Sequence, residues 1–117
     1  MELSVATRLV SEHAVVEVGG EVDVYTAPRL RDRLNEVVGS GQRHLVVDLS
    51  KVDFLDSTGI GVLVGVYRRL VRTDGSLVLV CPHEKLLKIL RIAGMDTVFK
   101  IYGSVPEATA ASPTPDA

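Results

Sequence analysis

The chain of 117 residues is long enough for one domain with a substantial apolar core, and its composition of 46% apolar and 24% charged residues is typical of a globular protein. Its formal net charge of −2 excludes a general attraction to nucleic acid or to an anionic membrane surface. The first ten residues lack a signal-peptide pattern, and the longest apolar run is about half as long as a membrane-spanning helix, so we expect a cytoplasmic protein. Cys81 is the single cysteine, so we expect neither a disulfide nor a cysteine metal cluster.

The amino-terminal part of the chain is expected to form two strands. Residues 3–10 and 14–22 are rich in valine and other apolar residues, and three polar residues separate the two segments. This short separation predicts that the strands are antiparallel neighbours. Gly19 and Gly20 predict a bulge or a local twist in the second strand.

The segment "TAPRLRDRLNEVVGSG" is predicted to form the first helix. Thr26 is a candidate N-cap, Pro28 falls in the first turn, and Gly39 or Gly41 provides a stop signal. The apolar residues of this segment recur at steps of three and four, which places them on one face: Ala27, Leu30, Leu34 and Val37.

The rest of the chain continues the alternation of strands and helices. The apolar segments at 44–49 and 76–81 have the pattern of strands buried on both faces of a parallel sheet, and 97–103 is predicted to be a final short strand. Helices are predicted at 58–72 and 84–94. We therefore predict an α/β domain with a mixed, mostly parallel sheet of about four to five strands and about four helices.

The carboxyl-terminal segment differs in composition from the rest of the chain. From Ser104 onward, "SVPEATAASPTPDA" is small, polar and proline-bearing, with little to bury. We predict a domain over residues 1–108 and a disordered tail over residues 109–117, whose removal would leave stability and partner affinity unchanged.

The junction "VDFLDSTGIGVLVG" (52–65) is the most unusual stretch of the sequence. Three small polar residues, Asp56, Ser57 and Thr58, separate two apolar runs, and the second run contains three glycines although it has the pattern of a helix. Glycine inside a helix costs about 1 kcal/mol relative to alanine. Asp56 or Ser57 is predicted to cap this helix by accepting a hydrogen bond from its first turn, and capping alone would account for either residue.

Three other chemistries at this junction find less support. The glycines resemble a dinucleotide-binding fingerprint, but residues 50–58 separate them from the predicted strand, and no acidic residue ends the next strand. A serine hydrolase would pair Ser57 with His83, yet the glycine that precedes the serine of a nucleophile elbow is missing. His13, His44 and His83 are scattered singly, without metal-ligand spacing. A small ligand-binding or hydrolytic domain that uses the Ser57 loop is the alternative function.

Ser57 is also suited to be the substrate of another protein. A hydroxyl at an exposed helix start, surrounded by small side chains, can enter a partner's active site, and a phosphate placed there adds about −1.5 to −2 charges. Free N–H groups and the helix dipole would tolerate that anion. The charge of the surface would then change while the fold stays intact.

Gly61 and Gly65 lie on the side of the predicted helix that faces away from its apolar residues. The predicted core-facing arc contains Ile60, Leu63, Val64, Tyr67, Leu70 and Val71. Gly59 falls nearer this arc, where a missing side chain would let the helix start approach the sheet. We predict that Gly61 and Gly65 form a bare strip at which a partner docks, with Arg68 and Arg72 beyond it; an outward face that merely tolerates glycine is the simpler explanation.

Three segments, "GGEVDVYTAPRLRDRL", "HLVVDLSKVDFLDSTGIGVLVGVYRRL" and "GMDTVFKIYGSVPEA", closely resemble the bacterial anti-sigma factor antagonists, which are stand-alone STAS domains. The resemblance covers about residues 3–108 in collinear order. Its most specific element is D-S-[ST]-G after a strand, here Asp56 to Gly59, supported by Asp23 in the "GEVD" segment. A single-domain STAS fold is therefore expected.

The resemblance implies a binding switch rather than an enzyme. Unphosphorylated members of the family bind an anti-sigma factor that is also an ATP-dependent serine kinase, and thereby free a sigma factor for transcription. The kinase phosphorylates the motif serine, here Ser57, and the complex separates until a serine phosphatase restores the active form. This switch implies no cofactor, no metal, and no contact with nucleic acid or membrane.

The resemblance also implies a set of site residues around Ser57. Asp56 would shape the phosphorylation loop, and Asp23 would lie near it at the same edge of the sheet, unless it is only a cap or turn residue before the first helix. Thr58 is the second hydroxyl and is expected to be structural. The partner-binding residues that we expect are Asp23, Asp56, Thr58, Gly59, Gly61, Val62 and Gly65.

Overall fold

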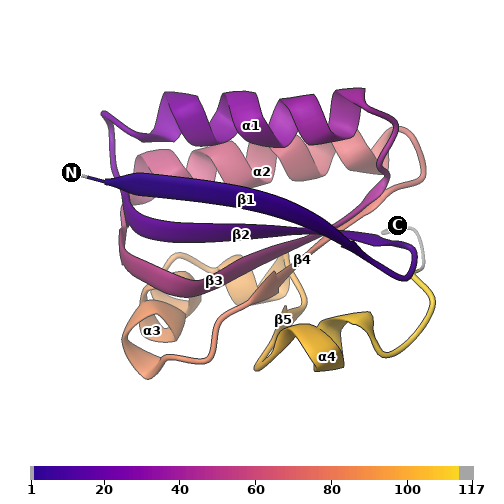
Figure 1. Ribbon diagram of the computed structural model, residues 1–117. Coiled ribbons are helices and arrows are strands. Elements are labelled where there is room, and N and C mark those ends of the chain that lie inside the picture. The colour runs from indigo at the N-terminus through magenta and orange to yellow at the C-terminus, as the bar shows by residue number, and fades with distance from the viewer. Residues whose placement is uncertain (1, 114–117) are drawn as a thin grey trace.

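The computed structural model describes residues 2–113, in which five strands form one sheet with helices packed against it (Figure 1). The strands follow one another across the sheet in chain order; β1 is antiparallel to β2, and every later pair is parallel. The predicted α/β class and the mixed, mostly parallel sheet are therefore confirmed. The elements are β1 (Leu3–Val10), β2 (His13–Val22), α1 (Ala27–Gly39), β3 (His44–Leu55), α2 (Ser57–Val71), β4 (Ser76–Val80), α3 (Glu84–Ile92), a 3₁₀ helix (Met95–Thr97), β5 (Ile101–Tyr102) and α4 (Val105–Thr109).

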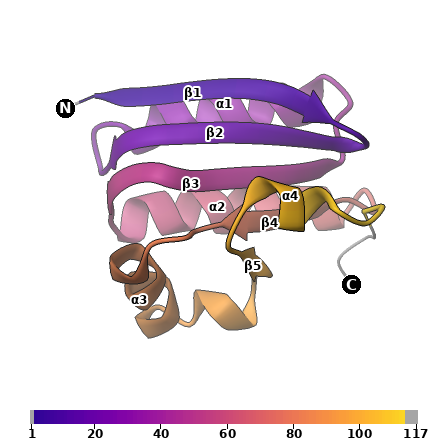
Figure 2. The same ribbon diagram turned by 60° about the horizontal axis from the view of Figure 1, so that its bottom comes forward.

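Helices cover both faces of the sheet. α1 and α2 lie side by side on one face, and α4 lies on the opposite face, where it contacts β3, β4 and β5 (Figures 1 and 2). Because successive strand residues point to opposite faces, the same strands supply both cores. The main core, beneath α1 and α2, includes Ala14, Val16, Val18, Leu45, Val47 and Leu49. A smaller cluster beneath α4 contains Val15, Val46, Val80 and Ala108.

Residues 2–113 contain no helix with both the length and the hydropathy that a membrane span requires.

The β1–β2 hairpin forms as predicted, with Ser11 in a left-handed conformation at its turn (φ 54°). The register between β2 and β3 shifts between Glu17 and Gly19 and again after Gly20, which confirms the predicted irregularity. Gly20 has a φ of +92°, and a Cβ there would lie 2.0 Å from the carbonyl oxygen of Glu2. The irregularity therefore requires glycine at position 20.

β3 is longer than predicted, because it continues beyond the apolar segment at 44–49 as far as Leu55. Polar residues between positions 50 and 53 hide this extension in the sequence, but Val52 and Leu55 are buried and pair with the end of β2. Only Asp56 then separates the strand from α2. The expectation of a long connection between this strand and the glycines was therefore wrong. The glycines still do not form a dinucleotide-binding loop, because all three lie inside α2 rather than in a phosphate-binding loop before it.

The last third of the domain also departs from the prediction. β5 is restricted to Ile101–Tyr102, since Gly94 (φ +75°) ends α3 and leads into the 3₁₀ helix. Phe99, expected within the strand, instead packs edge-on against Tyr67 of α2, with 5.3 Å between ring centroids. Packing of Phe99 against α2 thus takes the place of the predicted strand, and Thr97 and Val98 are exposed.

α4 falls in a segment that the composition assigned largely to the tail. The hydroxyl oxygen of Ser104 accepts a hydrogen bond from the Glu107 N–H (3.3 Å), which caps the helix, and the hydroxyl donates to the Glu107 carboxylate (3.1 Å). Ala108 is buried against the sheet, and Thr109 is the last helical residue. Residues 114–117 lie outside the described residues, so a disordered tail over 109–117 stays a prediction.

His13, at the start of β2, is a buried histidine with an unsatisfied ring atom. Its side chain is 5% exposed, and Nδ1 has no hydrogen-bond partner within residues 2–113. Burial is the largest influence and lowers the pKa of His13, and the field of His44 lowers it further; the Val10 backbone and the Glu12 carboxylate act in the opposite direction but more weakly in sum. The folded domain therefore opposes protonation of this ring.

We expect the free energy of unfolding to fall as the pH drops through about 6.5, because the unfolded chain takes up a proton on His13 there while the folded chain takes it up only at lower pH. Urea unfolding at about pH 7.5 and about pH 5.5 measures this loss. The variant His13→Gln lacks the titrating ring and should lose less stability over the same interval. Equal losses in the two proteins would show that other groups carry the pH dependence.

Candidate functional site

The D-S-T-G junction lies at the edge of the sheet where β2 and β3 end. Val22 and Leu55, the last residues of these two strands, are paired in the parallel ladder, and the Asp56 N–H donates to the Val22 carbonyl at 3.2 Å. Asp23 directly follows Val22, and Asp56 directly follows Leu55. The two aspartates that the sequence singled out therefore lie next to the ends of neighbouring strands. The structure thus confirms that Asp23 and the Ser57 loop share one edge of the sheet.

Asp56 is the residue that caps α2. Its backbone is extended, and its Oδ1 accepts hydrogen bonds from the N–H groups of Thr58 (2.9 Å) and Gly59 (3.2 Å). The Thr58 hydroxyl also donates to this oxygen. That hydroxyl, together with the two N–H groups, holds the pKa of Asp56 below its ordinary value, although partial desolvation acts in the opposite direction. Asp56 therefore carries a fixed negative charge at the start of the helix at neutral pH.

The two hydroxyls of the junction have different surroundings. Ser57 and Thr58 are both exposed, but Thr58 donates its hydrogen to Asp56, whereas the Ser57 hydroxyl makes no hydrogen bond to any residue in the described part of the chain. Ser57 is also the first residue of α2, directly behind the cap. Of the two hydroxyls, only that of Ser57 is free to enter another molecule's active site without first breaking a bond.

The first turn of α2 has fewer free N–H groups than the sequence suggested. The Asp56 carboxylate accepts from Thr58 and Gly59, and the Asp56 carbonyl accepts from Ile60 (3.1 Å). The expectation that free N–H groups would receive a phosphate on Ser57 was therefore wrong for these three groups, since the cap already occupies them. A phosphate would compete with Asp56 or remain a solvent-facing charge.

Asp23 holds the turn that leads into α1. Its side chain is buried, and Oδ1 accepts hydrogen bonds from the N–H groups of Tyr25 (2.9 Å) and Thr26 (3.0 Å). Thr26 occupies the predicted N-cap position but makes no capping bond; its hydroxyl oxygen instead accepts from the Asp23 N–H (3.0 Å) and the hydroxyl donates to the Glu21 carbonyl (2.8 Å). The geometry explains Asp23 as a turn residue, and its contact with a partner stays a prediction.

The three glycines of α2 have two different surroundings, as predicted. Gly59 is buried, and a Cβ there would lie 2.5 Å from Leu55 Cδ1 and 2.6 Å from Val22 Cγ1, so this glycine lets the helix approach the strand ends. Gly61 and Gly65 are exposed, and a Cβ at either would have no neighbour within 4 Å. Core packing therefore explains Gly59 but neither of the other two.

The buried face of α2 is shifted from the predicted arc. Leu63 and Leu70 are buried as expected, but Val66, which the spacing placed outside the arc, is buried as well. α2 packs against α1 as well as against the sheet, so its buried face is wider than one apolar stripe. The remaining predicted members are only partly buried: Ile60, Val64, Tyr67 and Val71.

An open groove of about 570 Å³ runs between α1 and α2, next to the junction. Thr58, Gly61, Val62 and Gly65, all predicted site residues, line it from α2. The α1 side and the loop before it contribute residues that the sequence analysis did not predict for the site: Val24, Ala27, Pro28, Arg31 and Asn35. Ala27, Arg31 and Asn35 recur every four residues along α1 and mark one helix face, but only the packing of α1 beside α2 makes that face part of the site.

His83 does not act as a base for Ser57 in this structure. Its Nε2 lies 2.5 Å from the Ser50 carbonyl oxygen, and the ring lines a separate cavity with Phe54 and Ile89. No three histidine, cysteine, aspartate or glutamate side chains within residues 2–113 gather closely enough to hold a metal ion.

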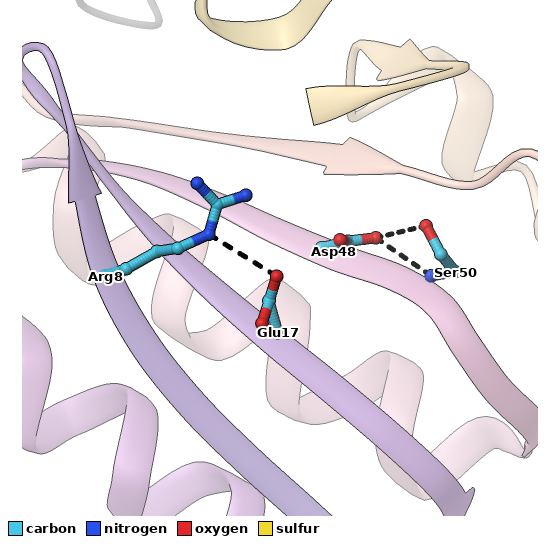
Figure 3. Close-up of polar contacts among 4 residues, drawn as sticks. All are labelled: Arg8, Glu17, Asp48 and Ser50. Atoms are coloured by element: carbon cyan, nitrogen blue, oxygen red, sulfur yellow. Dashed lines mark hydrogen bonds and ion pairs between the residues drawn. The ribbon is translucent and has the colours of Figure 1, made fainter. Parts of the chain in front are cut away.

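The face of the sheet that α1 and α2 leave uncovered carries polar side chains that pair with one another (Figure 3). Arg8 Nε lies 3.4 Å from Glu17 Oε2 across the β1–β2 ladder. Asp48 accepts from the Ser50 N–H (2.9 Å) and from the Ser50 hydroxyl. These groups satisfy one another on the strand surface and contribute nothing to the junction.

Comparisons with known proteins agree with this geometry. A family model described as the STAS domain matches residues 4–108. The anti-sigma-B factor antagonist of Staphylococcus aureus strain NCTC 8325 is 32% identical over 101 residues, which cover 86% of this chain and 94% of that protein. The protein of the same description from Listeria monocytogenes is 33% identical over 91 residues, 78% of this chain and 80% of that one. A crystal structure of an anti-sigma factor antagonist from Mycobacterium paratuberculosis superposes with a TM-score of 0.86 at 28% identity, covering 93% of this chain and 92% of the other.

Proposed function

The chain belongs to the STAS domain family, and we propose that it is an anti-sigma factor antagonist whose binding is switched off by phosphorylation of Ser57. The observation that carries the proposal is the unengaged Ser57 hydroxyl, exposed at the start of α2 beside a neighbouring hydroxyl that is held by Asp56. The relatives described as anti-sigma-B factor antagonists support the same role. The chain itself acts as a binding module and kinase substrate, without a cofactor or a catalytic site of its own.

Phosphorylation is carried out by the partner. The unphosphorylated domain binds an anti-sigma factor that is also a serine kinase, which frees a sigma factor. Within the complex, the Ser57 oxygen attacks the γ-phosphorus of ATP, the bond to the β-phosphate breaks, ADP leaves, and a base of the kinase takes the serine proton. A serine phosphatase later hydrolyses the phosphate ester and restores the binding form.

The added charge is large enough to separate the complex. A phosphate brings about −1.5 to −2 charges next to the Asp56 carboxylate, where the cap already occupies the N–H groups of Thr58, Gly59 and Ile60. A hundredfold loss of affinity corresponds to about 2.7 kcal/mol. One like charge in the partner at about 5 Å costs about 3 kcal/mol at an effective dielectric constant near 20.

The remaining predicted residues have defined parts in this proposal. Asp56, Thr58 and Gly59 hold the loop in the form that presents Ser57, and Asp23 fixes the adjacent turn. Gly61, Val62 and Gly65 continue the partner-binding surface along α2.

The test is to mix the purified domain and ATP with each anti-sigma factor serine kinase encoded in the source genome, and to locate any phosphate by fragmentation mass spectrometry. We expect one phosphate per chain, on Ser57, in the presence of the cognate kinase. A kinase inactivated in its ATP site is the control. A phosphate found on Thr58, or no phosphorylation by any of the kinases, would refute the proposed switch.

A further inference from the structure

We infer that the groove between α1 and α2 binds an apolar segment of the partner that carries an acidic side chain opposite Arg31. The inference rests on the proposed function, because the groove begins at Thr58, directly beside Ser57, and a partner that reaches Ser57 also reaches the groove. It adds the chemistry of the docking segment and a specificity residue, Arg31, on the other helix.

The shape of the groove suits an inserted segment. Ala27 and Pro28 of α1 and Val62 and Val66 of α2 line it, together with Val24 from the loop before α1. Val24 is 58% exposed and the adjacent Tyr25 is 85% exposed, so apolar surface continues from the groove to its rim. Exposed apolar surface that is continuous with a groove is typical of binding sites.

The glycines deepen the α2 side of the groove. Gly61 and Gly65 are one helical turn apart and both line it, and a Cβ at either position would project into open space. Each glycine lowers the intrinsic helix propensity of α2 and relieves no clash within the domain, unlike Gly59. Nothing in the free domain therefore requires glycine at these two positions. A partner segment that packs closely against the bare helix backbone would require it.

The charge of the groove selects an acidic occupant. Arg31 is the one charged residue among those described that line it. Its nearest acidic partner, Asp32, lies at 3.6 Å with both side chains more than half exposed, which makes a weak pair that a partner carboxylate can replace. Asn35 is already engaged, since Arg69 donates to its side-chain oxygen at 2.9 Å. Arg68 and Arg72, which the sequence placed beyond the glycine strip, do not line the groove.

The first experiment measures, by calorimetry, binding to the kinase that phosphorylates Ser57, with ADP bound so that no transfer occurs. We expect Arg31→Glu and Gly65→Leu each to weaken binding at least about tenfold, because one reverses the groove charge and the other fills the groove. The matched controls are Arg68→Glu, which reverses an exposed arginine on α2 outside the groove, and Gly39→Leu, an exposed glycine with open space around it at the end of α1. Both controls should stay within about twofold of the wild type. Thermal unfolding confirms that all four variants are folded.

The second experiment needs no kinase, so it separates failure of the groove from failure of the proposed function. A phage-displayed peptide library is selected on the wild-type domain after depletion on Gly65→Leu. We expect enriched peptides to combine apolar residues with aspartate or glutamate and to lose binding to Arg31→Glu. Enrichment of basic peptides, or of none beyond the depleted background, would overturn the inference even if Ser57 is phosphorylated. Equal weakening by Arg31→Glu and Arg68→Glu would overturn it too, since general electrostatic attraction would then explain the data.

Discussion

Ser57→Ala is expected to bind the anti-sigma factor kinase as tightly as the wild-type chain and to remain bound when ATP is added. The substitution removes only an exposed hydroxyl that makes no hydrogen bond within the described chain, while Asp56 continues to cap α2. Fold and docking surface should therefore be unchanged, but no oxygen remains at position 57 to receive the phosphate. Size-exclusion chromatography of the complex before and after ATP addition measures the effect.

A charged substitution at the same position completes this test. Ser57→Asp should bind the kinase at least about tenfold more weakly, because it places a second carboxylate beside Asp56 where the cap leaves few N–H groups to receive it. Ser57→Asn has nearly the same size without the charge and is the matched control, which should retain most of the affinity. If the asparagine variant were as weak as the aspartate variant, shape rather than charge would govern the switch. Full release of Ser57→Ala by ATP would exclude Ser57 as the site.

The amino-terminal half of the domain follows closely from local sequence patterns. Apolar segments separated by a short polar turn indicate the hairpin, and the glycine pair marks the register shift at Gly19 and Gly20. The helix of residues 27–39 begins and ends near the predicted proline and glycine signals. These features depend on residues close together in the chain, so the sequence alone contains the information.

Features that depend on distant neighbours were predicted less well. The extension of β3 to Leu55 depends on pairing with β2, and the burial of Val66 depends on α1. α4 is a different case, because the S-x-x-E pattern of Ser104 and Glu107, a signal for a helix start, is present in the sequence, but the small, polar composition around it outweighed that signal.

The candidate site shows the same division. The motif identified Ser57 and its cap, but the sequence left open whether Asp56 or Ser57 caps α2, because either side chain can accept the first-turn hydrogen bonds. The structure assigns the cap to Asp56 and thereby leaves the Ser57 hydroxyl free. Arg31 had no local signal, since its place in the groove arises from the packing of α1 beside α2.

Gly59→Ala is expected to destabilise the domain by about 1–3 kcal/mol, whereas Gly61→Ala and Gly65→Ala should each stabilise it by up to about 1 kcal/mol. All three glycines lie in α2 outside the left-handed backbone region, so alanine is conformationally acceptable at each and helix propensity favours it. At Gly59, however, the new Cβ would lie 2.6 Å from Cγ1 of the fully buried Val22, a β-branched side chain that can move only by disturbing the core.

The three alanine variants therefore form a matched set that isolates steric contact from helix propensity. Thermal unfolding should lower the midpoint of Gly59→Ala by several degrees and raise that of the other two, at about 4–8 °C per kcal/mol for a domain of this size. A rise for Gly59→Ala would mean that the start of α2 can move away from the strand ends, and the loop that presents Ser57 would then be less fixed than its contacts indicate. A fall for Gly65→Ala would mean that the glycine serves the stability of the free domain, which would remove the main reason to assign it to the binding of a partner.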